Sequence, residues 1–291
     1  MASAYAQLQW MGHALLRAQG FARRDEQTGQ GRRFSLYERA GSGAGPTALL
    51  VHGLGGSATS FTPIARQLCS LCKRVLLIDL PGHGTAELAA DDQPADPLEM
   101  AQALGRTLEV LAEPVLLVGN SLGGALVLSC GLFWPEQVAG VIALAPAGAP
   151  LSRAESEELR RVFRGGAESG AELGRRLFHS PPWAVRMFAR GLGEHIGSRA
   201  VQHIVRGIRA GAQGPSSDEL RAIRVPTLVL WGDSDGVLPS SGADYFRGAL
   251  PVGSFELLER TGHLPQIERP RAVLRRIAAF ISKPAPGAVG R

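Results

Sequence analysis

The 291-residue chain is long enough for one large α/β domain or two small ones, and its 45% hydrophobic and 20% charged residues exclude a disordered chain. Three cysteines are an odd number and cannot complete a disulfide framework. No apolar run is long enough to span a bilayer, and the N-terminus lacks the pattern of a secretory signal. We therefore expect a soluble, cytoplasmic protein. The excess charge of +5 lies wholly between Leu151 and Gly214, with 11 Arg against 6 Glu and no recognition motif, so nucleic acid is not an expected partner.

Short runs rich in Val, Ile and Leu alternate with longer segments of helical period along most of the chain. This alternation is typical of an α/β fold, in which helices flank a mostly parallel sheet. The predicted strands, in chain order, are residues 33–38, 47–52, 74–80, 115–119, 141–145, 227–231 and 254–258. The predicted helices are residues 63–72, 97–112, 122–133, 241–250 and 270–281.

Two segments depart from this alternation. Residues 1–20 can form an amphipathic helix with Leu8, Met11, Leu15 and Leu16 on one side, and its sparse charge favours packing on the body of the protein over membrane attachment. Residues 150–215 contain Arg-rich helical pieces without a convincing strand. We therefore predict a core formed by residues 1–149 and 216–291, with residues 150–215 as a helical cap inserted between two late strands.

The strongest chemical signal is VLLVGNSLGG at residues 115–124, a buried strand that runs through G-x-S-x-G directly into an apolar helix. A sharp strand-to-helix turn requires Gly119 and Gly123 on either side of its apex, and it forces the side chain of Ser121 outward. The helix N-terminus there favours developing negative charge. A phosphate-binding loop would require a basic residue after the glycines, and residues 122–128 offer none. Ser121 is therefore the candidate nucleophile, with an ordinary glycine-rich turn as the alternative.

A serine nucleophile needs a base and a group that orients the base. His263 follows the last predicted strand, and its loop lies at the carboxyl edge of the sheet, as Ser121 does. Asp233 and Asp235 both follow the strand at residues 227–231; we predict Asp235 as the orienting acid and keep Asp233 as the alternative. The backbone N–H groups of Leu122 and of Leu54, in the loop after the strand at residues 47–52, are the candidate oxyanion donors.

These motifs resemble those of the α/β-hydrolase fold enzymes with a helical lid, and the resemblance extends from Arg33 to Ile281. It rests on HGLGG at 52–56, DLPGHG at 79–84, GNSLGG at 119–124, GDSDGVLP at 232–239 and GHLPQIERP at 262–270. By position, the resemblance implies Ser121 as nucleophile, Asp235 as acid, His263 as base, and Leu54 and Leu122 as oxyanion donors. It also implies that Asp79 and His83 shape a loop near the site, and that no metal or cofactor is required.

The resemblance leaves the reaction open within the superfamily. Ser121 excludes the branches with an aspartate nucleophile, such as haloalkane dehalogenases and epoxide hydrolases. Asn120 resembles the GNSxGG of carbon–carbon bond hydrolases, but Leu264 stands where that subfamily commonly has an aromatic residue. We therefore rank hydrolysis of a carboxylic ester first and carbon–carbon hydrolysis second. Cofactor-free perhydrolase chemistry uses the same residues, and a non-catalytic lidded receptor is the minority hypothesis.

The cap carries the predictions about the substrate, which we expect to be a small molecule. Trp183, Met187 and Phe188 would supply an apolar lining for an acyl or alkyl group. One or two of the cap arginines could face the site and favour an anionic substrate, although a solvated helical face is the default for such charge. Cys69 and Cys72 form a C-x-x-C without a second pair or a nearby histidine, so no metal site is expected. No prediction is made for the oligomeric state.

Overall fold

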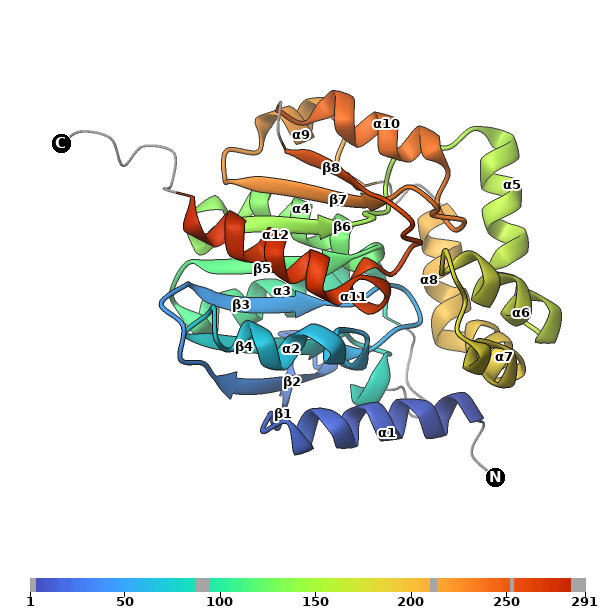
Figure 1. The fold of residues 1–291 in the computed structure, drawn as a ribbon, viewed down its shortest axis with the longest axis horizontal. Coiled ribbons are helices and arrows are strands. Elements are labelled where there is room, and N and C mark those ends of the chain that lie inside the picture. Colours follow the sequence, from blue (N-terminus) through green and yellow to red (C-terminus); the bar gives the residue numbers. More distant parts are fainter. Residues whose placement is uncertain (1–3, 87–94, 210–213, 252–253, 284–291) are drawn as a thin grey trace.

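The computed structural model describes residues 4–86, 95–209, 214–251 and 254–283. Within these ranges the chain forms an eight-stranded sheet with helices on both faces (Figure 1). The strands are β1 (Ala22–Gln27), β2 (Arg33–Ala40), β3 (Thr47–Val51), β4 (Arg74–Asp79), β5 (Val115–Asn120), β6 (Val138–Leu144), β7 (Thr227–Gly232) and β8 (Phe255–Leu258). The predicted α/β fold is confirmed.

The order of strands in the sheet is β1-β2-β4-β3-β5-β6-β7-β8. Strands β3 to β8 run parallel, while β2 is antiparallel to both of its neighbours, β1 and β4. Parallel neighbours end at the same edge of a sheet, so the loops after β3, β5, β7 and β8 meet there. These loops carry the residues singled out from the sequence.

Strand β1 was not predicted. Its sequence, ARRDEQ, contains no apolar alternation, and most of its side chains are exposed. A strand at the edge of a sheet has only one paired neighbour and can be polar on both faces. The hydrophobic pattern that identified the other strands is therefore missing from β1.

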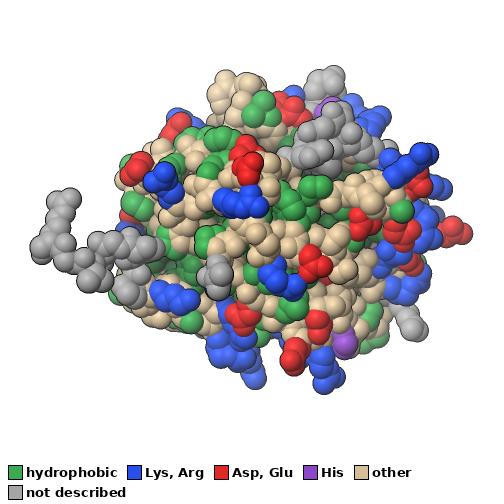
Figure 2. Space-filling model, turned by 90° about the horizontal axis from the view of Figure 1, so that it is seen from above, with side chains coloured by type: hydrophobic (Ala, Val, Ile, Leu, Met, Phe, Trp, Pro, Cys, Tyr) green, Lys and Arg blue, Asp and Glu red, His purple; other side chains and the backbone are tan. Residues whose placement is uncertain are grey.

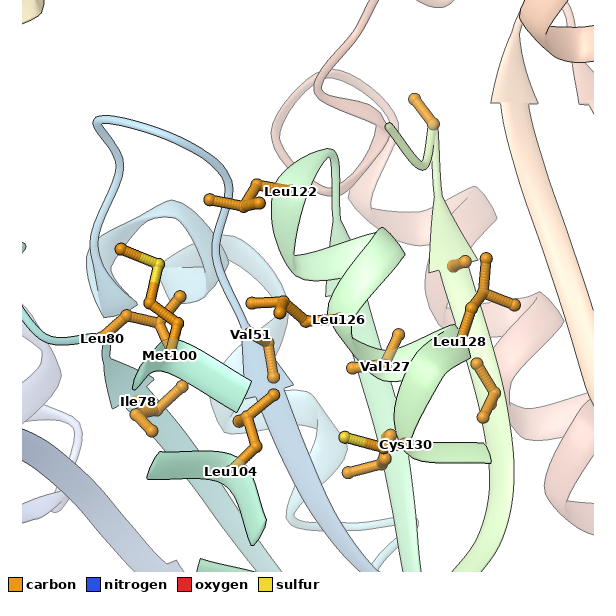
Figure 3. Packing of buried hydrophobic residues seen from close by; sticks show 14 of the residues in the cluster. Val51, Ile78, Leu80, Met100, Leu104, Leu122, Leu126, Val127, Leu128 and Cys130 are labelled. Atoms are coloured by element: carbon orange, nitrogen blue, oxygen red, sulfur yellow. The ribbon is translucent and has the colours of Figure 1, made fainter. Parts of the chain in front are cut away.

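Two hydrophobic layers cover the faces of the sheet. On one face, residues of α3 (Pro97–Leu111), α4 (Leu122–Phe133) and α10 (Ser240–Ala249) form one buried cluster. Figure 3 shows Val51 and Ile78 of the sheet near Met100 and Leu104 of α3. On the other face, α2 (Thr62–Leu68) and α12 (Pro270–Ser282) contribute Ile64, Leu68, Val273 and Ile277 to a second cluster. Strands covered on both faces explain the uninterrupted apolar runs of the sequence.

The described part of the segment between β6 and β7 contains helices joined by short loops, and no strand. It contains α5 (Arg153–Val162), α6 (Ala167–Arg176), α7 (Trp183–Ile196), α8 (Arg199–Arg209) and α9 (Ser217–Ala222). Helices α5 to α8 gather beyond the carboxyl ends of the parallel strands, on the right in Figure 1, whereas α9 packs against α4 and α10. The cap therefore covers the edge of the sheet that carries the candidate site. No described helix combines the length and apolarity needed to cross a membrane.

Helix α1 (Ala4–Ala18) packs on the body of the protein, as predicted, but through a different face. Of the four apolar residues expected to share the packed side, Leu16 is buried, whereas Leu8, Met11 and Leu15 are largely exposed. The buried face instead contains His13, which forms an ion pair with Asp79 and stacks on the ring of Tyr37. The hydrophobic pattern failed here because a polar contact determines which face turns inward.

Asp79, at the end of β4, connects three segments through a fully buried carboxylate. It is 3.0 Å from His13 Nε2 and accepts backbone N–H groups from Ala58 at 2.6 Å and Thr85 at 2.8 Å. Burial alone would raise the pKa of Asp79, but hydrogen bonding and charge from His13, with further help from the Thr85 N–H, leave that pKa below its usual value. Asp79 therefore holds α1 and two loops against the sheet.

We expect Asp79→Asn to lower the free energy of unfolding at pH 7 by about 3 kcal/mol, because an amide nitrogen would face groups that donate to the carboxylate. Since the folded pKa lies below the unfolded value of 3.8, the wild-type advantage should persist above that pH and shrink as the pH falls below it. Urea unfolding of both proteins at several pH values measures this. The control, Asp25→Asn, changes a carboxylate that is 56% exposed and should cost less than about 1 kcal/mol. Equal effects would contradict the proposed role of Asp79.

Candidate active site

Ser121 lies at the apex of the turn between β5 and α4. Its backbone has φ 55° and ψ −117°, a conformation that residues other than glycine rarely adopt. The flanking glycines are required by close packing, because a Cβ on Gly119 would lie 2.2 Å from Gly123 O and one on Gly123 would lie 2.2 Å from Val51 O. The turn is therefore too tight for other residues at these positions, and it presents Ser121 to the pocket described below.

The backbone around Ser121 is bonded to the neighbouring strand and to the loop that carries His263. Ser121 N–H donates to Leu144 O at 3.0 Å, and Ala147 N–H donates to Ser121 O. The side chain of Asn120 donates to Leu144 O at 3.0 Å and to His263 O at 3.1 Å. Asn120 was noted in the sequence only for its resemblance to a subfamily. In the structure it links the serine turn to the histidine loop.

His263 and Asp235 form the closest side-chain contact of the candidate site. His263 Nδ1 lies 2.7 Å from Asp235 Oδ2, and both side chains are almost completely buried. The other carboxylate oxygen, Oδ1, accepts the N–H groups of Val237 at 2.8 Å and Leu238 at 3.0 Å. Because the carboxylate can only accept from the ring, His263 carries its proton on Nδ1 and leaves Nε2 as a proton acceptor.

The alternative acid, Asp233, makes different contacts. Its Oδ1 accepts a hydrogen bond from the Ser234 hydroxyl at 2.8 Å and from the Thr261 N–H at 3.2 Å, and the residue is exposed. Asp233 therefore closes the loop after β7, while Asp235 contacts His263. Strands β7 and β8 are parallel neighbours in the sheet, so the loop after β7, which carries Asp235, and the loop after β8, which carries His263, meet at the same edge.

Ser121 and His263 are not joined by a hydrogen bond in the described part of the chain. The candidate base is therefore hydrogen-bonded to the candidate acid but not to the candidate nucleophile in this conformation. Such contacts are often long without substrate and shorten in the reacting complex.

The backbone N–H groups of Leu54 and Leu122 are the two candidate oxyanion donors. Both residues line the same pocket as Ser121. Leu122 is the first residue of α4, so its N–H has no acceptor within the helix, and neither N–H donates to another described group. Gly53 brings the two loops together, since a Cβ at that position would be 3.0 Å from Ser121 Cβ.

The loop that contains Leu54 is held by contacts from three directions. His52 Nε2 accepts the N–H of Leu80 at 3.1 Å, and its Nδ1 donates to Gly53 O at 2.8 Å. Gly55 O accepts both the Tyr5 hydroxyl of α1 and His195 Nε2 of α7, each at 2.9 Å. Burial lowers the pKa of both His52 and His195, so neutral rings make these bonds. The N-terminal helix and the cap therefore fix the loop jointly.

His83 and Asp79, the other polar residues of the DLPGHG motif, lie in the buried support of this loop. The His83 ring is 5.0 Å from the His52 ring, and its Nδ1 bonds to Pro81 O at 3.1 Å. Complete burial lowers the pKa of His83 to about 3. A ring that stays neutral and contacts backbone is consistent with the structural role that the resemblance implied.

Glu268 connects the histidine loop to the cap, and its role was not recognised in the sequence. Its carboxylate accepts three backbone N–H groups, from Gly262 at 2.7 Å, His179 at 3.1 Å and Ser180 at 2.9 Å. Next to this, the N–H of His263 donates to Leu177 O at 2.9 Å. Glu268 belongs to the GHLPQIERP motif and ends the short helix α11 (Pro265–Glu268), but the sequence of a lone glutamate gives no indication of its partners.

A pocket of about 310 Å³ opens beside Ser121, between the carboxyl edge of the sheet and the cap. Its walls are mostly apolar, as in many small-molecule sites. Lining residues from the core include Leu54, Leu122, Pro146, Trp231, Val237 and Leu238, and those from the cap include Leu159, Arg160, Phe163 and Val205. Among these cap residues, Leu159 and Arg160 of α5 and Phe163 directly after it are separated by one, three or four positions, as expected for one face of a helix.

Trp183, Met187 and Phe188, the predicted substrate-lining residues, are not among the residues that line this pocket. They lie on α7, where Trp183 is 76% and Met187 is 61% exposed. Helix α7 packs against α6 and α1 through its other faces, with Gly191 against Tyr5. The cap helices that do face the pocket are α5, whose charged sequence concealed its apolar stripe, and α8, which contributes Val205.

Most of the described cap arginines pair with cap glutamates. Arg176 pairs with both Glu158 and Glu172, and Arg161 donates to Glu158 through Nη2 at 2.7 Å. On the face shown in Figure 2, basic and acidic side chains are interspersed, and charges of both signs gather at the end that carries the cap. Within the described residues, no group of three or more His, Cys, Asp or Glu side chains is placed to hold a metal ion.

Comparison with known proteins supports the family that the fold and the candidate site indicate. The model of the alpha/beta hydrolase family matches residues 48–276. The chain belongs to the alpha/beta hydrolase family. It is 30% identical over 273 residues, 91% of this chain and 71% of the relative, to the dihydrolipoyllysine-residue acetyltransferase component of an acetoin cleaving system from Pseudomonas putida.

Lipases are also among the similar proteins. The chain is 24% identical over 271 residues to the monoacylglycerol lipase ABHD6 of Homo sapiens, covering 86% of this chain and 79% of that relative. A solved structure of a membrane phospholipase A, described as a bacterial virulence factor, superposes with a TM-score of 0.78 at 28% identity, covering 94% of this chain and 90% of the other. Together, the alpha/beta hydrolase family and these lipases support ester hydrolysis as the general class of reaction.

We expect Glu268→Gln to speed hydrogen exchange at the amides of His179, Ser180 and Gly262 by at least about tenfold, because Gln removes the negative charge and replaces one of the two accepting oxygens by an NH2 group that only donates. Exchange followed by NMR or mass spectrometry measures this. The control is Glu259→Gln, since Glu259 is exposed and its carboxylate makes no hydrogen bond within the described residues. Unchanged exchange in Glu268→Gln would show that Glu268 does not hold these segments together.

Proposed function

We propose that this chain is a serine hydrolase that cleaves carboxylic esters through an acyl-enzyme. Ser121 is the nucleophile, His263 the general base and Asp235 the group that orients the base. The observation that carries the proposal is the 2.7 Å contact between His263 and Asp235 at the same edge of the sheet as the strained turn of Ser121. A serine on such a turn, with a histidine and a buried acid nearby, is the arrangement that acyl transfer requires.

In the first half of the reaction, His263 Nε2 takes the proton of Ser121 Oγ as that oxygen attacks the ester carbonyl carbon. The carbonyl oxygen becomes an oxyanion and accepts hydrogen bonds from the N–H groups of Leu54 and Leu122. His263 then donates its proton to the leaving alcohol as the carbon–oxygen bond breaks. The acyl group remains on Ser121.

In the second half, a water molecule attacks the acyl carbonyl while His263 again takes a proton. The tetrahedral intermediate collapses, Ser121 Oγ leaves and receives the proton from His263, and a carboxylic acid is released. Asp235 stays ionised throughout and stabilises the imidazolium. Because Asp235 Oδ1 accepts two backbone N–H groups, its orientation does not depend on the ligand.

The pocket favours a small or medium substrate with an apolar group beside the carbonyl. Its volume of about 310 Å³ is at the lower end of ligand sites, and most of its wall is aliphatic or aromatic. We propose Leu159, Phe163, Val205 and Trp231 as the residues that contact this apolar group. The lining role predicted for Trp183, Met187 and Phe188 would require these residues to contact substrate from outside this pocket.

We expect Ser121→Ala to reduce kcat for p-nitrophenyl pentanoate by at least about a thousandfold while far-UV circular dichroism stays unchanged. A fluorophosphonate probe should label the wild type stoichiometrically at Ser121 and leave the variant unlabelled. Turnover at the wild-type rate in Ser121→Ala would refute the proposal. Stoichiometric labelling without turnover of any carbonyl substrate would instead favour a receptor.

The choice of reaction is tested with a panel of substrates assayed side by side. We expect activated esters to give a burst of nitrophenolate equal to the enzyme concentration, because the acyl-enzyme forms before water attacks it. A ring-fission diketone acid and a carboxylic acid with hydrogen peroxide complete the panel. A kcat/KM for either that exceeds the best ester value would assign carbon–carbon hydrolysis or perhydrolysis in its place.

A further inference from the structure

Helix α5 presents one stripe of side chains to the pocket beside Ser121. The stripe consists of Ser156, Leu159 and Arg160, followed by Phe163 directly after the last residue of the helix; the four positions have the i, i+3, i+4 and i+7 spacing of one helical face. Leu159 and Phe163 are apolar, as expected for a wall of this pocket. Arg160 is therefore a charged side chain on an apolar stripe that faces the candidate site.

Arg160 carries a positive charge, whereas the other described residues that line the pocket are uncharged. Among the described residues that line the cavity, it is the one that is ionised at neutral pH. No acidic side chain in that lining neutralises it. The Arg160 side chain is 43% exposed, so its guanidinium lies at the mouth of the cavity, in contact with both the apolar wall and solvent.

The donors of Arg160 are largely unused within the protein. Its closest acidic partner among the described residues is Glu157, at 3.7 Å from Nη2, and the guanidinium makes no hydrogen bond there. Glu157 itself accepts a hydrogen bond from Arg153 at 3.2 Å. By contrast, Arg161, Arg175 and Arg176 each donate hydrogen bonds to cap glutamates. Arg160 thus keeps its planar set of N–H donors available for a ligand.

We propose that Arg160 binds an anionic group of the substrate, so that the natural substrates are esters that carry a carboxylate or a phosphate at one end and an apolar segment near the scissile carbonyl. This inference rests on the proposed ester hydrolysis at Ser121 and names its substrate class. A guanidinium binds carboxylate and phosphate oxygens through paired hydrogen bonds, whereas the lining shared by Leu54, Leu122 and Trp231 accepts the apolar part.

The test compares pairs of esters that differ by one anionic group, with the wild type and two variants. On the acyl side, p-nitrophenyl pentanoate is paired with the mono-p-nitrophenyl ester of glutaric acid, in which a carboxylate replaces the terminal methyl group. On the alcohol side, 1-hexanoylglycerol is paired with 1-hexanoylglycerol 3-phosphate. Arg160→Gln removes the charge from the pocket. Arg153→Gln is the matched control, because Arg153 lies on the same helix, also contacts Glu157 and is 93% exposed.

We expect Arg160→Gln to lower kcat/KM for the anionic member of at least one pair by about tenfold or more and to change its neutral partner by less than about twofold. Arg153→Gln should leave both members within about twofold. The responding pair tells whether the anion is a carboxylate on the acyl side or a phosphate on the alcohol side. Raising the ionic strength should reduce the wild-type preference for that anionic ester.

Equal losses on the charged and neutral esters, or no loss on either, would overturn the proposal for Arg160. Thermal unfolding of Arg160→Gln shows whether an equal loss comes from misfolding. In that case Arg160→Lys keeps the test decisive, because it retains the charge without the paired donors and should retain part of the preference for the anion. Failure here is distinguishable from failure of the proposed function. If Ser121→Ala abolishes hydrolysis of the neutral esters while Arg160→Gln leaves the preference intact, only the assignment of substrate class is wrong.

Discussion

The tight turn between β5 and α4 is the constraint on which the candidate site depends. Ser121 occupies a backbone conformation with positive φ, which costs a residue with a side chain about 1–3 kcal/mol. Close packing of Gly119 and Gly123 against neighbouring backbone and the bond from Ser121 N–H to Leu144 O compensate for that cost. The same turn starts α4, so the hydroxyl, a free N–H group and the positive end of a helix come together in one place.

The other parts of the site are attached to this turn and to the cap. Asn120 donates to the backbone of His263, and Glu268 accepts N–H groups from both the histidine loop and the α6–α7 connection. Gly55 O receives hydrogen bonds from α1 and from the cap helix α7. The cap is therefore bonded to the loops that carry the proposed base, His263, and a proposed oxyanion donor, Leu54. A shift of the cap would move these groups as well as the wall of the pocket.

Much of this arrangement was predictable because it depends on strand order. Parallel strands end at one edge of the sheet, so Ser121, Asp235 and His263 could be expected to converge from their positions after three predicted strands. Strand β1 and the packed face of α1 were not predictable, because an exposed edge strand has no hydrophobic pattern and a buried His13–Asp79 pair decided the face of α1. Trp183 and Met187 illustrate the same limit, since large apolar side chains on a cap helix can be exposed.

The central claim is that Ser121 carries the acyl group during turnover. The most direct measurement is mass spectrometry of the wild-type protein, quenched in acid while it hydrolyses a slowly deacylated ester and then digested. We predict that the peptide containing Ser121 gains the mass of the acyl group, and that the modification maps to the Ser121 oxygen. An acyl group on another residue, or its absence while the enzyme turns over in the steady state, would contradict the account.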